Sequence, residues 1–204
     1  MNKVCTNWKA HFPTEKVGLE YYEEFAGRAQ NVSAEVFRVK NPIEAQEIMA
    51  NLIKFTNASK IVAVDGPLQD AANITEHIKS LGVEIYTEQN DIAEHAESSD
   101  IGISAAEFGI AETGSVVTDA MDIAGRLVSM LSTIHVVFMQ SANVVAGIEQ
   151  AFEIISEVYH RGYISFITGP SRTADIERVL TIGCHGPSRL VIIAVDEESG
   201  GGVN

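Results

Sequence analysis

The chain has 204 residues, of which 46% are hydrophobic, and a formal net charge of −14. This length and composition suffice for one sizeable core, which excludes disorder over most of the chain. The negative charge argues against binding to nucleic acids or anionic membranes, but it does not exclude a small anion held in a local basic pocket.

The predicted elements of the first half follow one another as alternating helices and strands. Asn41, Pro42 and Glu44 form a good helix start signal, with Asn41 as the N-cap. In chain order we expect a helix at about 14–29, a strand at 34–39, a helix at 41–53, a strand at 60–64, a helix at 70–81, a strand at 83–86 and a short acidic helix at 90–99.

The second half continues the same pattern. We expect strands at 101–104, 116–118, 133–139, 163–168 and 190–195, and helices at about 119–130 and 143–160. His135 lies inside an apolar strand, so we interpret it as a core or edge histidine rather than a metal ligand. Alternation of this kind predicts an α/β fold with three layers (α/β/α) around a mainly parallel sheet.

We find no internal repeat and no linker, so we assign residues 1–204 to a single domain. Residues 1–33 form its helical N-terminal arm, and residues 196–204 are expected to be a mobile tail.

Cysteine content and the ends of the chain bear on its compartment. Cys5 and Cys184 are far apart and form no CxxC pattern, which argues against a disulfide framework, a zinc knuckle or an iron–sulfur cluster on this chain. The N-terminus has no apolar signal segment, and no apolar run approaches the roughly 20 residues of a membrane span. We therefore expect a cytoplasmic protein.

The segment 101–119 contains a turn-rich stretch with Glu107, Glu112 and Gly114. Gly114 can adopt a positive φ, and a carboxylate among small apolar residues needs a partner because burial of a lone charge is costly. The stretch is either a functional site or a β-hairpin turn in which backbone donors hold Glu112.

Ligands of open parallel sheets bind beyond the carboxyl ends of the strands. The loops 65–67, 105–114 and 169–177 each follow a predicted strand, so we expect them to meet at one edge of the sheet. The segment 183–187 would join them only if the chain doubles back.

The 169–177 loop carries the strongest signal for anion binding. Arg172 offers a planar fork of donors that suits a carboxylate or a phosphate. The alternative is a structural turn in which Arg172 pairs with a nearby carboxylate. The predicted substrate-binding residues are Ser171, Arg172, Thr173, Asp175, Glu177 and Gly114.

Cys184 and His185 lie side by side in the sequence, but a catalytic thiol needs a base placed across space, and a metal needs further ligands. We interpret His185 as a residue that orients a loop or lines the pocket, and we assign no metal site.

Three motifs together resemble the LUD-domain family: residues 110–117 around Glu-Thr-Gly, GPSRTADIE at 169–177, and GCHGP at 183–187. The resemblance implies a NagB/RpiA/CoA-transferase-like fold. It also implies a link to the oxidation of L-lactate to pyruvate beside partner subunits that carry iron–sulfur clusters. Because this sequence has no cluster ligands of its own, we expect no cofactor on this chain.

These observations support a leading hypothesis and two others. In the first, the chain is an accessory or small-carboxylate-binding component of lactate oxidation, in which Arg172 clamps the carboxylate of lactate, and Glu112 and His185 are acid–base candidates. In the second, it is an acyl- or CoA-transferring enzyme with Glu112 as nucleophile, by analogy with the Glu-x-Gly turn of CoA transferases. The third is a purely structural assembly subunit. Whether the chain is an enzyme stays open, and a homo-oligomer is compatible with its sequence.

Overall fold

The computed structural model describes residues 17–159, 163–172, 174–176, 179–181 and 186–196, the two short ranges 174–176 and 179–181 by their backbone alone. The predicted mobile tail lies outside the described residues from position 197 onward, as does the N-terminal arm before Val17.

The centre of the fold is a six-stranded sheet in the order β1-β12-β7-β4-β2-β3, with every neighbouring pair parallel. The central strands are apolar on both faces, as expected for a sheet covered on both sides. The strands are β1 (Glu35–Val39), β2 (Lys60–Ala63), β3 (Glu84–Tyr86), β4 (Ile101–Ala105), β7 (Ile134–Gln140) and β12 (Arg189–Val195).

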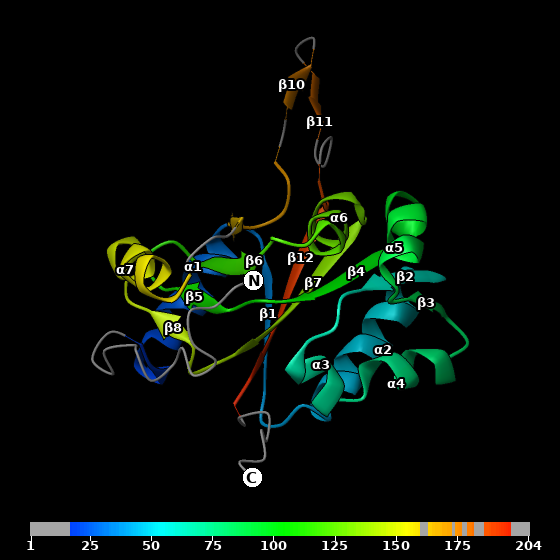
Figure 1. Ribbon diagram of the computed structural model, residues 1–204, viewed down its shortest axis with the longest axis horizontal. Coiled ribbons are helices and arrows are strands. Elements are labelled where there is room, and N and C mark those ends of the chain that lie inside the picture. Colours follow the sequence, from blue (N-terminus) through cyan, green and yellow to red (C-terminus); the bar gives the residue numbers. More distant parts are fainter. Residues whose placement is uncertain (1–16, 160–162, 173, 177–178, 182–185, 197–204) are drawn as a thin grey trace.

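Helices cover both faces of this sheet, which gives the predicted three-layer α/β/α fold (Figure 1). Along β4, Ile101 and Ile103 face one helical layer, while Gly102 faces α6. The first layer is α2 (Glu44–Thr56), α3 (Pro67–Ala71) and α4 (Ile74–Ser80). The second is α1 (Tyr22–Asn31), α5 (Gln89–His95) and α6 (Ile123–Leu131), together with two single 3-10 turns, Leu19–Tyr21 and Ala96–Ser98.

The hydrogen bonds expected of Asn41 and Glu44 are present, although α2 itself begins at Glu44, with Ile43 rather than Asn41 as its N-cap. The amide of Glu44 donates to Asn41 Oδ1 over 3.1 Å, and Glu44 Oε2 accepts from the amide of Lys40 over 2.9 Å. This is a reciprocal capping arrangement that satisfies donors left free at a helix N-terminus.

Three predicted helices differ from the observed ones. The first begins at Leu19 as a 3-10 turn rather than at Thr14, which lies outside the described residues. The helix expected at 70–81 is two helices, because Asn73 adopts a left-handed conformation between them.

The third begins later than predicted. Val144–Val145 form β8, and α7 therefore starts only at Ile148 and runs to Val158.

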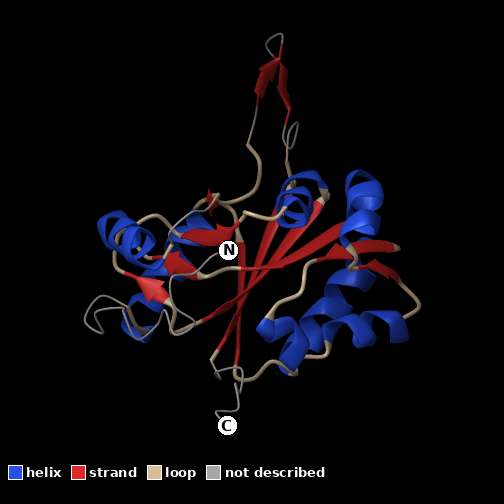
Figure 2. Ribbon diagram, viewed as in Figure 1, coloured by secondary structure: helices blue, strands red, loops and turns tan. Residues whose placement is uncertain are grey.

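A second, four-stranded sheet in the order β8-β5-β6-β9 lies beside the first (Figure 2). The predicted strands at 116–118 and 163–168 belong to this sheet and not to the parallel one. Its further strand β5 was expected as part of a turn. The strands are β5 (Phe108–Ile110), β6 (Ser115–Asp119), β8 (Val144–Val145) and β9 (Ile164–Ile167).

The two sides of the second sheet are packed differently. On one side, α1 contacts both sheets, because Phe25 and Ala29 share a core with Val116 of β6 and Met139 of β7. On the other side lies α7, whose Phe152 ring is 5.7 Å from the ring of Phe166.

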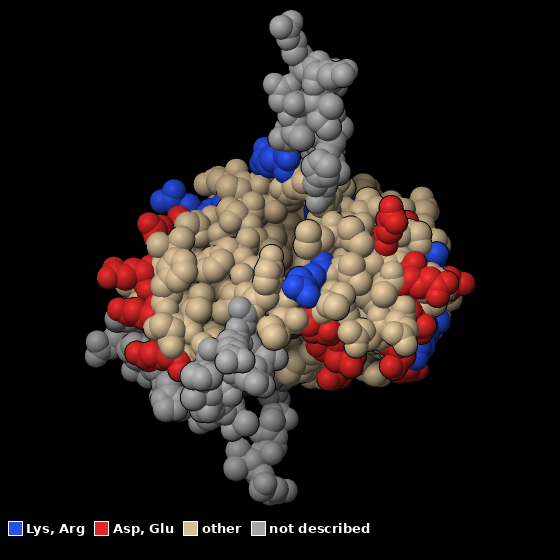
Figure 3. Space-filling view, turned by 45° about the horizontal axis from the view of Figure 1, so that its top comes forward, with Lys and Arg blue, Asp and Glu red and all other residues tan. Residues whose placement is uncertain are grey.

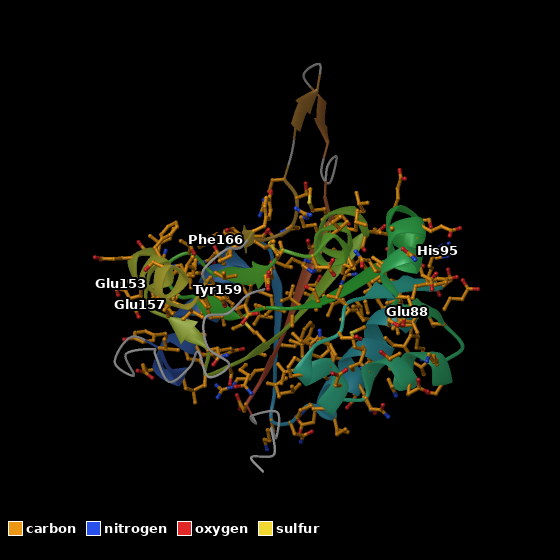
Figure 4. All side chains as sticks on the ribbon, in the orientation of Figure 1. Glu88, His95, Glu153, Glu157, Tyr159 and Phe166 are labelled. Carbon is orange, nitrogen blue, oxygen red and sulfur yellow. The ribbon has the colours of Figure 1, made fainter. Side chains whose placement is uncertain are left out.

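Glu153 and Glu157 point away from the body on the outer side of α7 (Figure 4). The helix is therefore amphipathic, as a helix that covers a sheet should be.

The segment predicted as the 169–177 loop runs into a β-hairpin. Strands β10 (Ala174–Ile176) and β11 (Val179–Thr181) pair antiparallel and project from the body (Figure 1). Among the described helices, none combines the length and apolar character needed to cross a membrane.

Candidate functional site

Two of the sequence motifs meet at the C-terminal end of α1. Gly114 has a φ of +67°, and a Cβ at this position would overlap the backbone of Arg28 and Ala29. Gly169 has a φ of +74°, and a Cβ there would overlap the carbonyl oxygen of Val32. Both positions need glycine for their conformation and for the close approach, and the positive φ predicted for Gly114 is confirmed.

The end of α1 that these glycines contact is a Schellman motif. The amide of Ser33 donates to the carbonyl of Gln30 over 2.9 Å, and the amide of Ala34 donates to the carbonyl of Ala29 over 3.0 Å. Ser33 itself is left-handed, with a φ of +71°.

A chain of hydroxyls joins the first motif to the strand that leads into the second. Ser115 Oγ lies 2.8 Å from Thr113 Oγ1 and 2.7 Å from Thr168 Oγ1. The contact arises because β6 and β9 are antiparallel neighbours, with Val116 opposite Ile167. The Glu-Thr-Gly turn and the start of the GPSR segment are therefore held together.

Arg172 lies at the same end of α1. Its Nη2 donates to Ser33 Oγ over 2.6 Å, and its side chain is exposed. Within the part of the chain whose side chains are described, Arg172 forms no ion pair, whereas Arg28, Arg38 and Arg189 each lie within 4.0 Å of a carboxylate. Figure 3 shows a basic side chain beside the foot of the hairpin, while most of the acidic side chains in view lie farther from it.

The chain doubles back after the hairpin, which was the condition for the 183–187 segment to join the 169–177 loop. The amide of Ser171 donates to the carbonyl of Pro187 over 2.8 Å, and Gly186 lies against the Ser171 side chain. The side chains of four predicted site residues lie outside the described residues: Thr173, Asp175, Glu177 and His185.

Glu112 is exposed, so the burial expected for this carboxylate does not occur. Its Oε2 accepts a hydrogen bond from the amide of Ile148 over 3.1 Å, at the first turn of α7. This matches the turn interpretation, in which backbone donors hold Glu112, and a helix N-terminus favours such an anion. No hydrogen bond or ion pair between the described side chains joins Glu112 to Arg172.

We expect Glu112→Ala to lower the free energy of unfolding by about 1 kcal/mol, because an orphan amide of α7 loses its acceptor. Glu149→Ala is the matched control, since Glu149 lies in the same first turn without this bond. Urea unfolding of both variants measures the difference; equal losses would show that the helix does not depend on Glu112.

The parallel sheet also has a cleft of about 420 Å³ at the carboxyl ends of β2 and β4. The connection after β2 covers one face of the sheet and the connection after β4 covers the other, so the cleft lies at a topological switch point. The loops 65–67 and 105–107 both line it, as predicted. Neither Glu112 nor Arg172 lines it. The expectation that the 169–177 loop also meets this edge of the parallel sheet is wrong, because that segment follows β9 of the second sheet.

The charge of this cleft is unsuited to an anion. Its described lining contains no lysine, arginine or histidine, and it includes the carboxylates of Asp65, Glu107, Asp119 and Asp122. Among the side chains that the structure describes, no three His, Cys, Asp or Glu groups are arranged to hold a metal ion.

At the cleft wall, Ser104 Oγ lies 2.8 Å from Nε2 of His135. Both side chains are buried, and desolvation lowers the pKa of His135 to about 4. His135 is therefore neutral at pH 7, which agrees with its interpretation as a core histidine.

A second groove, of about 750 Å³, lies between α2 and the amino ends of β1 and β12. Two of its three charged groups are paired, since Arg189 donates to both carboxylate oxygens of Glu35 over 2.7 and 2.9 Å; the third is Lys54 of α2. Of these three places, the end of α1 is the one where a guanidinium without a carboxylate partner among the described side chains lies beside the sequence motifs.

Sequence reasoning missed Ser33 and the end of α1. A left-handed helix terminus is usually signalled by glycine, and here the position holds serine, so no local pattern marked it.

Comparisons with known proteins agree with the motifs. The LUD domain profile matches residues 22–195. A lactate utilization protein C from Halalkalibacterium halodurans is 31% identical over 159 residues, covering 74% of this chain and 69% of that protein. One from Anoxybacillus flavithermus is 28% identical over 203 residues, covering 93% and 89%.

Among solved structures, a DUF162 family protein from Deinococcus radiodurans has a similar fold, with a TM-score of 0.64 at 19% identity over 86% of this chain and 96% of that one. The profile match covers most of the chain and includes all three motifs, so the chain belongs to the LUD-domain family.

Proposed function

We propose that this chain is a cytoplasmic component of a system that oxidises L-lactate to pyruvate, and that it binds a small carboxylate such as lactate at Arg172. Relatives named lactate utilization protein C support the system. Because the chain has no cysteine pattern for a cluster, the proposal assigns electron transfer to partner subunits that carry iron–sulfur clusters.

One observation carries the carboxylate site. The Arg172 guanidinium is exposed, and its described hydrogen bond goes to the neutral Ser33 hydroxyl. A neutral acceptor orients the guanidinium without neutralising its charge, so the charge stays available for a carboxylate. In the proposal Ser171 and Thr173 add hydroxyl donors, and Asp175 and Glu177 orient the arginine.

The close backbone contact of Gly114 keeps the neighbouring turn near the ligand. Glu112 and His185 remain the acid–base candidates, and their role depends on how near the bound ligand lies to them.

Arg172→Ala tests the site. We expect a roughly 30-fold loss of affinity for lactate or pyruvate, about 2 kcal/mol, because a charge-assisted hydrogen-bond pair is lost. Lys79→Ala is the control, since Lys79 is an exposed cation of α4, in the opposite helical layer, and lies 2.7 Å from Glu76. Isothermal titration calorimetry of both variants gives the affinities. An unchanged affinity in Arg172→Ala would show that Arg172 does not bind the carboxylate.

A second function is favoured by the exposure of Glu112 in its Glu-Thr-Gly turn. In this alternative the carboxylate attacks the carbonyl of an acyl-CoA, the CoA thiolate leaves, and its return to the anhydride releases the acid and leaves a glutamyl thioester. Borohydride reduction in the presence of acyl-CoA should then label Glu112, and Glu112→Gln should abolish the label. Absence of label in the unmodified protein would remove this function.

A further inference from the structure

Ser33 occupies a position that ordinarily belongs to glycine. It is the residue after the C-cap Val32 in the Schellman motif of α1, and its φ is +71°. Non-glycine residues are strained in this region, and such strain persists only where the surroundings maintain it. The motif itself is made by backbone amides, so it does not require the serine hydroxyl.

The hydroxyl has another partner. Ser33 Oγ accepts the 2.6 Å hydrogen bond from Arg172 Nη2, across 139 positions of sequence. Gly169 of the Arg172 segment lies against the carbonyl of Val32. Gly114 of the Glu-Thr-Gly turn lies against the backbone of Ala29, about one helical turn earlier in α1. Two sequence motifs are therefore held against the same end of the helix, residues 28–33.

We propose that Ser33 is a positioning residue for Arg172, and that the end of α1 forms one wall of the carboxylate site. An exposed arginine has many rotamers, and holding one of them before the ligand arrives lowers the entropic cost of binding. A carboxylate in place of the hydroxyl would hold the arginine equally well but would compete with the ligand. The inference rests on the carboxylate site of the proposed function and adds to it the element that orients the arginine.

The decisive variant is Ser33→Gly, because it removes the hydroxyl and the backbone strain together. We expect its thermal midpoint to equal or exceed that of the unmodified protein, while its affinity for lactate or pyruvate falls about 10-fold. A purely structural role would move stability and affinity in the same direction, so their separation identifies positioning.

Two further variants complete the design. Ser33→Asn should recover most of the affinity, since asparagine tolerates the left-handed conformation and offers an amide oxygen to Arg172. Asn57→Gly is the matched control: Asn57 is left-handed at the end of α2, with a φ of +52°, and α2 lies in the opposite helical layer. It should leave the affinity unchanged.

A double-mutant cycle with Arg172→Ala separates this inference from the function on which it rests. If Ser33 acts through Arg172, Ser33→Gly should cost no further affinity in the Arg172→Ala background. A full effect of Arg172→Ala with no effect of Ser33→Gly would overturn the positioning role alone. No effect of Arg172→Ala would overturn the carboxylate site, and equal losses from Ser33→Gly in both backgrounds would show that Ser33 acts independently of the arginine.

Discussion

Gly114→Ala is expected to lower the free energy of unfolding by about 4 kcal/mol. Two costs combine in this substitution. Alanine is strained at a φ of +67°, and its Cβ would overlap the backbone of Arg28 and Ala29. Backbone atoms of a helix cannot rotate away as a flexible side chain can, so either the turn or α1 must shift, and α1 contacts both sheets.

Gly82→Ala isolates the first cost. Gly82 has a φ of +77° at the end of α4, but nothing lies within 4 Å of a Cβ placed there. We expect this variant to lose about 1 kcal/mol, which is the conformational penalty without the overlap. Chemical denaturation of both proteins gives the comparison, and similar losses would mean that the turn is not packed tightly against α1.

Acidification below pH 6.5 is expected to destabilise the protein through His135. Burial lowers the pKa of this imidazole from 6.5 to about 4 in the folded state. Between these values the unfolded chain binds a proton that the folded chain does not, so the free energy of unfolding falls as the pH falls. The decrease starts near pH 6.5, levels off below about pH 4, and amounts to about 3 kcal/mol for this group.

Carboxylates also titrate in this range, so the contribution of His135 is measured by difference. His135→Asn keeps a polar side chain beside Ser104 but does not titrate. The decrease in its free energy of unfolding between pH 7 and pH 4 should therefore be about 3 kcal/mol smaller than in the unmodified protein. Proton NMR of the histidine resonances provides a direct measurement. A His135 resonance that titrates near pH 6.5 would contradict the assignment, as would an unchanged pH dependence in His135→Asn.

Much of the parallel sheet could be predicted from the sequence. The apolar runs at 60–64, 133–139 and 190–195 are buried on both faces, and such runs differ clearly from the alternating pattern of a half-exposed strand. The capping residues Asn41 and Glu44 were also predictable, because their partners lie within four positions.

The assignment of strands to sheets could not be predicted in the same way. The run at 116–118 carries the same apolar signal whether it joins the parallel sheet or the second one. The break at Asn73 and the strand β8 at Val144–Val145 were missed because packing and pairing there outweigh helical periodicity.

For the site, the sequence by itself determined the chemistry. It identified Arg172 among hydroxyls, the glycines of the Glu-Thr-Gly and GPSR motifs, and the family to which they belong. These are local properties of short segments, and side-chain chemistry and turn geometry are encoded locally.

Only the tertiary structure decided which of these segments meet. It placed Glu112 at the start of α7, Arg172 at Ser33, and an acidic cleft where the parallel strands end. Contacts between residues as distant in sequence as Ser33 and Arg172 follow from strand order and helix packing. Those depend on how all the apolar surfaces of the chain are buried together, which no local pattern records.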